Sequence, residues 1–318
     1  MSFMSHSSDH SSRSVLQSNC FGEVGPKYVK DCTRNWASQS KLGGGTFGVV
    51  YEARDTDGLK FAALRLESKH PGYRQRMRDL TEQDLETLTA FEHRNILSVL
   101  GYSKSEEATV LLYPLAGVTC LKAALDSAEI ASKMEWSSRI KIFIGIVAAL
   151  EYCYYYHRMG GTPCYHRDVK PSNVFLTVEW IPKLVCCGLS RLIPLVDDDK
   201  TAALGIVGLG SEGGFLCPEF TRDRTFDEKS EVFSVGVTAL QPLGTVGNWI
   251  ITGRTSFVDG EPSVTEQISE ISEDDDSSAE DEAVEAVLGA RDRRPEWEAA
   301  LLPAIREFAK LTVRLGSI

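Results

Sequence analysis

Eight residues near position 45 have the composition of a phosphate-binding loop. Residues 43–50 read GGGTFGVV and match the pattern G-x-G-x-x-G-x-V. Glycine has no Cβ, so its backbone can approach a phosphate group closely. A dinucleotide-binding fold needs a helix directly after such a loop, whereas residues 49–53 here are typical of a strand. The context therefore favours a β-hairpin that covers a nucleotide. A glycine-rich hairpin turn with no ligand is the simpler alternative.

A second stretch carries polar residues suited to phosphoryl transfer. Residues 165–176 read YHRDVKPSNVFL and match H-R-D-x-x-x-x-N. In this pattern the aspartate, here Asp168, accepts the proton of a substrate hydroxyl, and the asparagine, here Asn173, holds a magnesium ion. Lys170, two residues after the aspartate, is typical of enzymes that phosphorylate serine and threonine. This longer pattern is far more specific than the glycine loop.

The elements around these motifs predict strands first and helices second. Short β-rich segments occupy residues 49–53, 60–66 and 109–115, and a helical period runs through residues 74–90. Residues 136–156 form a long apolar helix, and its expected inner face is lined by Ile140, Phe143, Ile144, Val147 and Leu150. This order indicates an α+β protein with a small β-rich lobe followed by a larger helical lobe.

Composition and charge narrow the class of protein to which the chain can belong. Of the 318 residues, 42% are hydrophobic and 25% are charged, as in ordinary globular proteins. The net charge of −11 argues against nucleic-acid binding. The 11 acidic residues of segment 261–285, which holds no Lys or Arg, account for the whole excess. We expect a Ser-rich flexible tail at residues 1–24 and a single two-lobed domain at 25–318.

Targeting and redox signals point to the cytoplasm. The first 18 residues have no apolar run of the kind found in a secretory signal. The uncharged residues 232–253 fit a buried helix better than a membrane span, because they include Pro242 and several glycines. None of the eight cysteines has the spacing of a zinc site, and reduced thiols are expected.

Both motifs, in this order, give the chain a resemblance to the protein kinase superfamily. Within it, the chain is most similar to the interleukin-1-receptor-associated kinase/Pelle group and the plant receptor-like kinases. The likeness covers about residues 36–260 and is carried by segments 33–36, 93–102 and 188–191 and by Tyr113, which falls at the gatekeeper position. The resemblance implies a bilobal protein-kinase fold, with an N-lobe at about 36–114 and a C-lobe at about 118–318.

The resemblance also assigns the expected site residues. Catalytic roles fall to Asp168, Lys170 and Asn173. The residues expected around ATP are Gly43, Gly45, Gly48, Val50, Ala62 and Tyr113. No metal-ligating residue is expected, because the usual magnesium motif D-F-G is replaced by Cys186, Cys187 and Gly188. A soft thiol is a poor ligand for Mg²⁺, which prefers carboxylate oxygen. ATP binding stays open, and Mg²⁺ binding is disfavoured.

Other departures affect the ion pair that normally holds the nucleotide phosphates. Leu64 stands where the β3 lysine belongs. Arg65 points to the opposite face of the strand, and Lys60 lies about 13 Å away at ~3.3 Å per residue. Counting back from the 93–102 motif places Asp84 where the partner glutamate belongs. If the alignment slips, the counterpart is Glu82 or Glu86.

Two further acidic substitutions and the chain's last part also depart from the family. Glu212 replaces the threonine that contacts the catalytic aspartate, and Glu231 replaces the aspartate that braces the catalytic loop. Residues 297–315 resemble the penultimate kinase helix. If Pro295 instead opens the last helix, the middle helices are reduced.

The sequence therefore predicts a pseudokinase that works as a scaffold or allosteric partner in a phosphorylation pathway. Its expected partners are signalling proteins, such as an active kinase or an adaptor. A weakly active Ser/Thr kinase is the first alternative, and a nucleotide-independent interaction module, with Leu64 and Tyr113 filling the pocket, is the second. Segment 261–285 is either a solvated loop or a docking strip for a basic partner.

Overall fold

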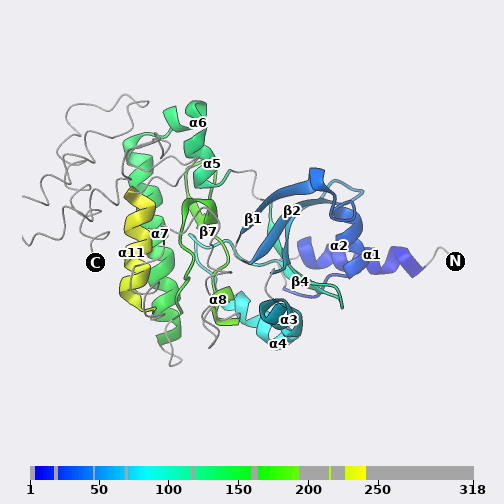
Figure 1. The fold of residues 1–318 in the computed structure, drawn as a ribbon. Coiled ribbons are helices and arrows are strands. Elements are labelled where there is room, and N and C mark those ends of the chain that lie inside the picture. The colour runs from blue at the N-terminus through cyan, green and yellow to red at the C-terminus, as the bar shows by residue number, and fades with distance from the viewer. Residues whose placement is uncertain are drawn as a thin grey trace, which may run out of the picture. The chain divides into compact units, whose positions relative to one another are not determined.

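The computed structural model divides the chain into two compact units (Figure 1). We call Met1–Gly117 with Cys186–Val207 the N-unit, and Val118–Val185 with Gly208–Ile318 the C-unit. The structure describes residues 4–17, 21–45, 47–68, 71–115, 119–158, 164–192, 215 and 226–240. The predictions for Glu212, for residues 241–253, for segment 261–285 and for residues 295–315 lie outside these ranges.

A five-stranded antiparallel sheet forms the frame of the N-unit. Its order is β1-β2-β3-β5-β4. The strands are β1 (Lys41–Gly45), β2 (Gly48–Arg54), β3 (Lys60–Leu66), β4 (Gly101–Lys104) and β5 (Thr109–Pro114). The β2–β3 turn is closed by the Asp55 carboxylate, which accepts hydrogen bonds from the N–H groups of Asp57 and Leu59. Gly58 completes the turn with φ +89°, a conformation that suits glycine.

Alternate residues of β3 point into two separate apolar cores. Ala62, Leu64 and Leu66 belong to the first cluster of buried side chains, together with Met77, Leu85 and Tyr113. Phe61 and Ala63 belong to the second cluster. This alternation is the period of two that a strand imposes on its side chains. Each face of the sheet therefore has its own hydrophobic core.

Helices of the N-unit supply the rest of both cores. On the side of the second cluster, α2 packs against β2 and β4. On the side of the first cluster, α3 contributes Met77 and α4 contributes Leu85. The bounds are α1 (Met4–Gln17), α2 (Pro26–Cys32), η1 (Ser38–Ser40), α3 (Pro71–Asp79), α4 (Glu82–Glu86), η2 (Thr87–Ala90) and α8 (Leu189–Leu192).

The predicted flexible tail at residues 1–24 is wrong for most of its length. Residues 4–17 form helix α1, and Leu16 is buried in the second cluster. The Oγ of Ser12 accepts a hydrogen bond from the N–H of Gly25 (3.1 Å), and Arg13 pairs with Asp55 and Asp57. The serine content alone suggested disorder. The buried Leu16 and the polar contacts of Ser12 and Arg13 are enough to hold the helix against the N-unit.

Residues 21–24 are also ordered, along the outer side of β4. The N–H of Val24 donates to the carbonyl of Tyr102 (2.7 Å), and the N–H of Tyr102 donates to the carbonyl of Gly22 (3.0 Å). A Cβ at Gly101 would lie 2.5 Å from the Gly22 oxygen, so only glycine fits there. The last strand of the sheet therefore has a partner on both sides.

The C-unit is mainly helical in its described part. Its helices are α5 (Leu121–Asp126), α6 (Ala128–Ser132), α7 (Trp136–Arg158), η3 (Pro171–Asn173) and α11 (Glu228–Leu240). Strands β6 (Val174–Leu176) and β7 (Pro182–Leu184) pair as a hairpin. Helices α7 and α11 lie side by side and contact each other (Figure 1).

The predicted inner face of the long helix is partly wrong. In α7, Ile144 is 59% exposed and Val147 is 40% exposed. The buried face consists of Arg139, Ile142, Phe143, Ile146, Ala149, Leu150 and Cys153. Because apolar residues surround this helix, the 3.6-residue period could not select one face. Within the described ranges, no helix is long and apolar enough to cross a bilayer.

Candidate active site

The glycine loop joins β1 to β2 in the N-unit. Gly45 faces Gly48 across the hairpin, and a Cβ at Gly43 or Gly45 would meet nothing within 4 Å. Gly48 is different, because its φ is +148° and a Cβ there would lie 2.0 Å from the carbonyl oxygen of Arg65. Gly48 therefore sets the close approach of β2 to β3, and the other two glycines leave open backbone.

The three residues other than glycine that are expected around ATP lie together. Val50 pairs in register with Leu64, and Ala62 pairs with Tyr113 across β3 and β5. Ala62 and Tyr113 are buried in the first cluster, and Val50 packs against it. Burial raises the pKa of Tyr113 well above its usual value of 10.0, so this phenol stays neutral. The N-unit thus gathers all six residues that the sequence placed around ATP on β1, β2, β3 and β5.

Leu64 packs in the hydrophobic core at the position where active kinases have the β3 lysine. Its side chain is 4% exposed and lies among Phe47, Leu66, Leu111 and Tyr113 in the first cluster. The prediction that Arg65 faces the other way is confirmed, since its guanidinium stacks over Trp36 at 5.2 Å. Lys60 is exposed at the beginning of β3. Neither cation therefore takes the place of the missing lysine.

Asp84 belongs to a helix cap. Its carboxylate accepts hydrogen bonds from the N–H (2.8 Å) and the hydroxyl (2.8 Å) of Thr81, and its own N–H donates to Thr81 Oγ1. The Thr81 N–H is the main cause that holds the pKa of Asp84 below its usual value. This reciprocal capping box begins α4 just after α3 ends at Asp79. The helix that carries the glutamate in active kinases is therefore interrupted here. Asp84 bonds to Thr81 in the cap of α4.

The segment that replaces the magnesium motif packs with the N-unit. Cys186 has φ +63° and lies against the first cluster, and Cys187 is buried. Gly188 has φ +84°, and a Cβ there would lie 2.4 Å from the ring of Phe91. Arg76 of α3 donates to the carbonyl of Leu192 at the end of α8 (3.3 Å). Two thiols and apolar contacts thus occupy the place of a metal ligand.

The C-unit assembles the three predicted catalytic residues within hydrogen-bond distance. Asn173 Nδ2 donates to Asp168 Oδ2 (2.7 Å) and to the Asp168 carbonyl (2.8 Å). Lys170 Nζ lies 3.1 Å from Asp168 Oδ1. The side chains of Asp168 and Lys170 are 12% and 9% exposed. Both carboxylate oxygens of Asp168 are therefore already held by neighbours, with a fixed orientation.

A buried network below the loop holds it in this shape. His166 Nδ1 accepts from the N–H of Asp168 (3.2 Å), so His166 Nε2 carries the proton that is donated to the carbonyl of Val185 (2.7 Å). Glu231 of α11 accepts from the N–H groups of His166 and Arg167. Arg167 has φ +64°, a strained value that these contacts maintain.

Glu231 therefore braces the catalytic loop as the aspartate that it replaces does in the family. The extra methylene still lets the carboxylate reach both N–H groups, at 2.9 Å for Arg167. Burial is the main cause that raises the pKa of Glu231 above its ordinary value of 4.5. The sequence showed the substitution, but only the structure shows that the contact survives.

The described residues do not fit a magnesium ion in the usual family position. Among them, no group of three or more His, Cys, Asp or Glu side chains is placed to hold a metal. The N-unit places Leu64 and Cys186 where the phosphate-binding cation and the metal-binding carboxylate would be. The donors needed to hold Mg²⁺ with the β- and γ-phosphates are thus replaced by apolar and thiol groups.

Comparison with known proteins agrees with this architecture. The protein kinase domain model matches residues 36–285, and the chain belongs to the protein kinase family. Curated relatives include the G-type lectin S-receptor-like serine/threonine-protein kinase SD1-13 of Arabidopsis thaliana, 32% identical over 222 residues, which are 70% of this chain and 24% of the relative. Receptor-like protein kinase HERK 1 of the same plant is 30% identical over 215 residues, 68% of this chain and 24% of the relative.

A solved structure is similar in fold. It is the pseudokinase domain of BIR2, an immune regulator of the RLK/Pelle family, with a TM-score of 0.67 and 21% sequence identity. The match covers 91% of this chain and 78% of that one. The chain spans about a quarter of the length of the curated relatives named above. The chain is thus similar to part of receptor-like kinases in sequence and to a pseudokinase domain in fold.

Proposed function

We propose that this chain is a pseudokinase domain that serves as a scaffold or allosteric partner for signalling proteins in a phosphorylation pathway. The observation that carries the proposal is Leu64, a buried apolar side chain in the place of the lysine that holds the nucleotide phosphates. Cys186 in place of the magnesium-binding aspartate supports it independently. We further propose that the protein acts in the cytoplasm.

Rate arithmetic supports regulation over catalysis. Removal of one preorganised charge-stabilising group costs ~10²–10³ in rate, and active kinases turn over at ~1–100 per second. Loss of both the lysine and the aspartate would leave turnover near ~10⁻² per second or below. A surface that binds a partner does not need either residue, so the domain can keep its fold and its partners without ATP.

A weakly active Ser/Thr kinase is the second candidate. The assembled group of Asp168, Lys170 and Asn173 favours it, because each side chain is held ready for a hydroxyl substrate. In this candidate Asp168 accepts the substrate proton and Lys170 steadies the transferred phosphate. It lacks a cation at Leu64, and the packing of Leu64 in the core weighs against it.

A thermal-shift titration separates the two candidates. The unfolding midpoint of the wild-type chain would be followed against ATP, with EDTA, Mg²⁺ or Mn²⁺. We expect no metal-dependent rise for the wild type. A metal-independent rise would indicate nucleotide binding by a pseudokinase and would also agree with the proposal.

A phosphotransfer assay with radiolabelled ATP and myelin basic protein completes the test. The wild type is compared with Asp168→Asn, which removes the proton acceptor. We expect equal background incorporation from both proteins. A metal-dependent shift together with incorporation that Asp168→Asn abolishes would overturn the pseudokinase proposal.

A further inference from the structure

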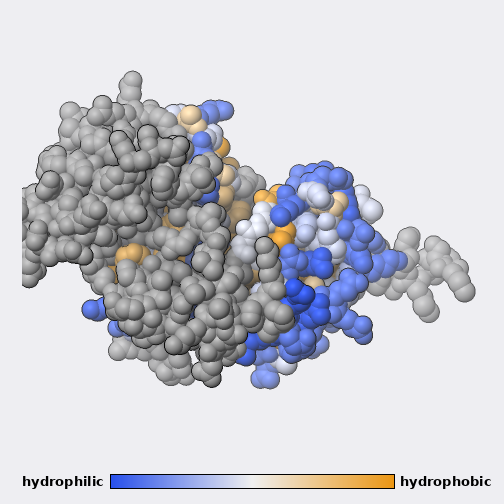
Figure 2. Space-filling view, in the orientation of Figure 1, coloured by the Kyte–Doolittle hydropathy of each residue, from blue (hydrophilic) through white to orange (hydrophobic). Residues whose placement is uncertain are grey.

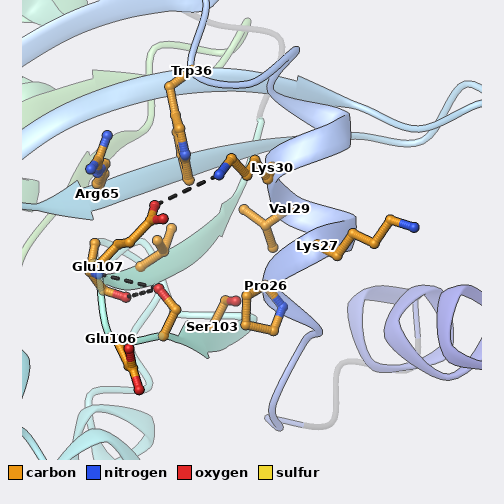
Figure 3. A pocket seen from close by; sticks show the side chains of 12 residues that line it. Pro26, Lys27, Val29, Lys30, Trp36, Arg65, Ser103, Glu106 and Glu107 are labelled. Atoms are coloured by element: carbon orange, nitrogen blue, oxygen red, sulfur yellow. Dashed lines mark hydrogen bonds and ion pairs between the residues drawn. The ribbon is translucent and has the colours of Figure 1, made fainter.

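A cavity of about 480 Å³ lies on the face of the N-unit sheet opposite Leu64 (Figure 3). It is bordered by α2, by β3 and β5, and by the turn between β4 and β5. Its volume falls within the range of ~300–1,000 Å³ that small-molecule sites occupy. We call it the Trp36 pocket, after the aromatic side chain that the close-up shows beside Arg65.

An unusual backbone turn holds Trp36 in place. Arg34, Asn35 and Trp36 have φ values of 53°, 56° and 59°, three consecutive left-handed residues without a glycine. Left-handed backbone is unfavourable for each of them, so tertiary contacts must maintain it. Trp36 supplies these contacts by packing on Tyr51 at 5.2 Å and over Arg65 at 5.2 Å. The indole is therefore a rigid wall of the pocket.

Arg65 brings a positive charge with spare hydrogen-bonding capacity. Its Nε is buried and has no hydrogen-bond acceptor among the described residues. Stacking on Trp36 holds the guanidinium plane, and a planar guanidinium binds a carboxylate with two parallel hydrogen bonds. Such a ligand would satisfy the group that the protein leaves unsatisfied.

The other charges of the pocket select a singly charged anion. Lys30 and Arg65 bring two positive charges to the pocket and Glu107 brings one negative charge, so their net charge is one positive. Lys27 and Glu106 also line the pocket, but Figure 3 shows both side chains extending away from Trp36. Lys30 lies 3.7 Å from Glu107, and both side chains are well exposed, so this pair can open at little cost. One carboxylate would neutralise the pocket, whereas a phosphate dianion would exceed its charge and approach the carboxylate of Glu107.

The apolar wall indicates what accompanies the carboxylate. Pro26 and Val29 of α2 and Val110 of β5 line the cavity beside the charged groups. In Figure 3, Val29 and Pro26 lie on the α2 side, and Lys27 extends away from the labelled Trp36. The wall can take one aliphatic side chain next to the anion. The pocket therefore combines an anion site with an apolar site, as acidic peptide motifs require.

We propose that the Trp36 pocket binds an acidic peptide segment of a partner protein, in which an aspartate or glutamate pairs with Arg65 and an adjacent aliphatic side chain packs on Pro26 and Val29. This docking site lies on the opposite face of the sheet from the residues expected around ATP. It goes beyond the pseudokinase proposal and does not depend on whether the chain binds ATP or transfers phosphate.

An NMR titration of the full chain tests the proposal. The probe is a mixture of capped hexapeptides with Leu-Glu fixed at the centre and the other positions varied. Matched mixtures carry Leu-Gln or Leu-phosphoserine. We expect the Leu-Glu mixture to shift the Arg65 Nε–H and Trp36 Nε1–H signals until saturation. The Leu-Gln mixture should leave them in place, and the phosphoserine mixture should bind more weakly.

Variants then assign the effect to the pocket. Arg65→Met should weaken the binding of the Leu-Glu mixture by about tenfold or more, which corresponds to about 1.4 kcal/mol. Lys30→Met should have a smaller effect, since its ammonium is exposed. Lys60→Met, which removes an exposed cation from the same strand, should bind like the wild type. For variants without Arg65, the Trp36 signal reports binding.

Several outcomes would overturn the proposal. They are equal shifts with Leu-Gln, tighter binding of phosphoserine, no saturable shift with any mixture, and unchanged binding by a folded Arg65→Met. The unfolding midpoint shows whether each variant is folded. If Arg65→Met is unfolded, Arg65→Lys gives the same test, because it keeps the charge but loses the paired hydrogen bonds.

Discussion

The catalytic loop of the C-unit and the part of the N-unit that corresponds to the phosphate-binding region of active kinases differ from the family to different extents. In the loop, Asp168, Lys170 and Asn173 are present and hold one another within 3.1 Å. In the N-unit, the lysine and the magnesium-binding aspartate are replaced by Leu64 and Cys186, and both of these side chains contact the first apolar cluster. One region keeps its polar network, and the other has become hydrophobic packing.

The difference teaches which kinase residues also have a structural role. The Asn173 amide donates to the carboxylate and the carbonyl of Asp168, and Lys170 pairs with the same carboxylate, so loss of either side chain would leave polar groups without a partner. A lysine at position 64 would sit in an apolar core and need a partner carboxylate. Without nucleotide phosphates to stabilise that charge, leucine would be the more stable residue there. Retention of Asp168 therefore does not by itself indicate catalysis.

Glu231→Ala should have the largest effect on the free energy of unfolding, because it removes the residue that braces the preserved catalytic loop. The change leaves the buried N–H groups of His166 and Arg167 without their acceptor. Each orphaned buried group costs about 1–3 kcal/mol, so we expect a loss of about 4 kcal/mol. Urea unfolding would measure it, with the exposed Lys229→Ala on the same helix as control. A loss below 1 kcal/mol would show that the loop does not depend on this brace.

Leu64→Ala tests the altered region and should have the next largest effect. Truncation of a buried leucine leaves a cavity and costs about 2–5 kcal/mol, and we expect about 3 kcal/mol. Leu42→Ala, at a position 52% exposed, should cost less than about 0.5 kcal/mol. Equal costs for the two variants would contradict the view that Leu64 replaces the lysine by packing. Denaturant midpoints of the three proteins provide the comparison.

The pH dependence of the free energy of unfolding should show a smaller effect, which also comes from Glu231. Burial raises the pKa of Glu231 above 4.5, so the folded state holds its proton more tightly than the unfolded state. The contribution of this group to stability is complete below pH 4.5 and is lost as the pH rises through the folded pKa. The slope for one group cannot exceed about 1.4 kcal/mol per pH unit.

Glu231→Gln has no such ionisation and is the matched reference. The unfolding free energy of the wild type minus that of Glu231→Gln should therefore decrease from pH 4.5 upward. Chemical denaturation at four pH values would measure the difference. A difference that increases with pH would mean that the two N–H donors outweigh burial and lower the pKa.

The smallest expected effect concerns the interrupted helix of the N-unit. Thr81→Ala removes the cap that begins α4 and should destabilise the protein by about 1 kcal/mol. Thr56→Ala, at an exposed turn position, should change stability by less than about 0.5 kcal/mol. Thermal unfolding of both variants provides the measurement. If Asp84 instead acted through a distant cation, Thr81→Ala would have no effect.

Local patterns predicted much of this molecule. The glycine hairpin, β2, β3, β5, the long helix and the catalytic loop each have a signal within about ten residues, and the kinase fold they imply is confirmed. Alternation along β3 also predicted correctly that Arg65 and Leu64 point to opposite faces. These features depend on the period of an element or on a short spacing, which the sequence displays directly.

Features that depend on distant partners were missed. Helix α1 has weak helical residues, and its docking depends on Gly25, Asp55 and Asp57. The sequence showed that Asp84 and Glu231 differ from the family, but not that one caps a helix and the other still reaches its donors. A capping-box pattern, Thr-x-x-Asp at 81–84, was visible and could have identified the first of these.

The pairing of residues 22–24 with β4 has a consequence for aggregation. An unpaired outer strand is a template onto which another chain can add a strand. A protein shortened to residues 36–318, where the kinase family match begins, would expose the N–H and carbonyl groups of Tyr102 that Val24 and Gly22 now occupy. Such a chain should self-associate more readily than the full chain, and light scattering at increasing concentration would reveal it. In this protein, residues 22–24 already occupy the outer side of β4, where another chain could otherwise add a strand.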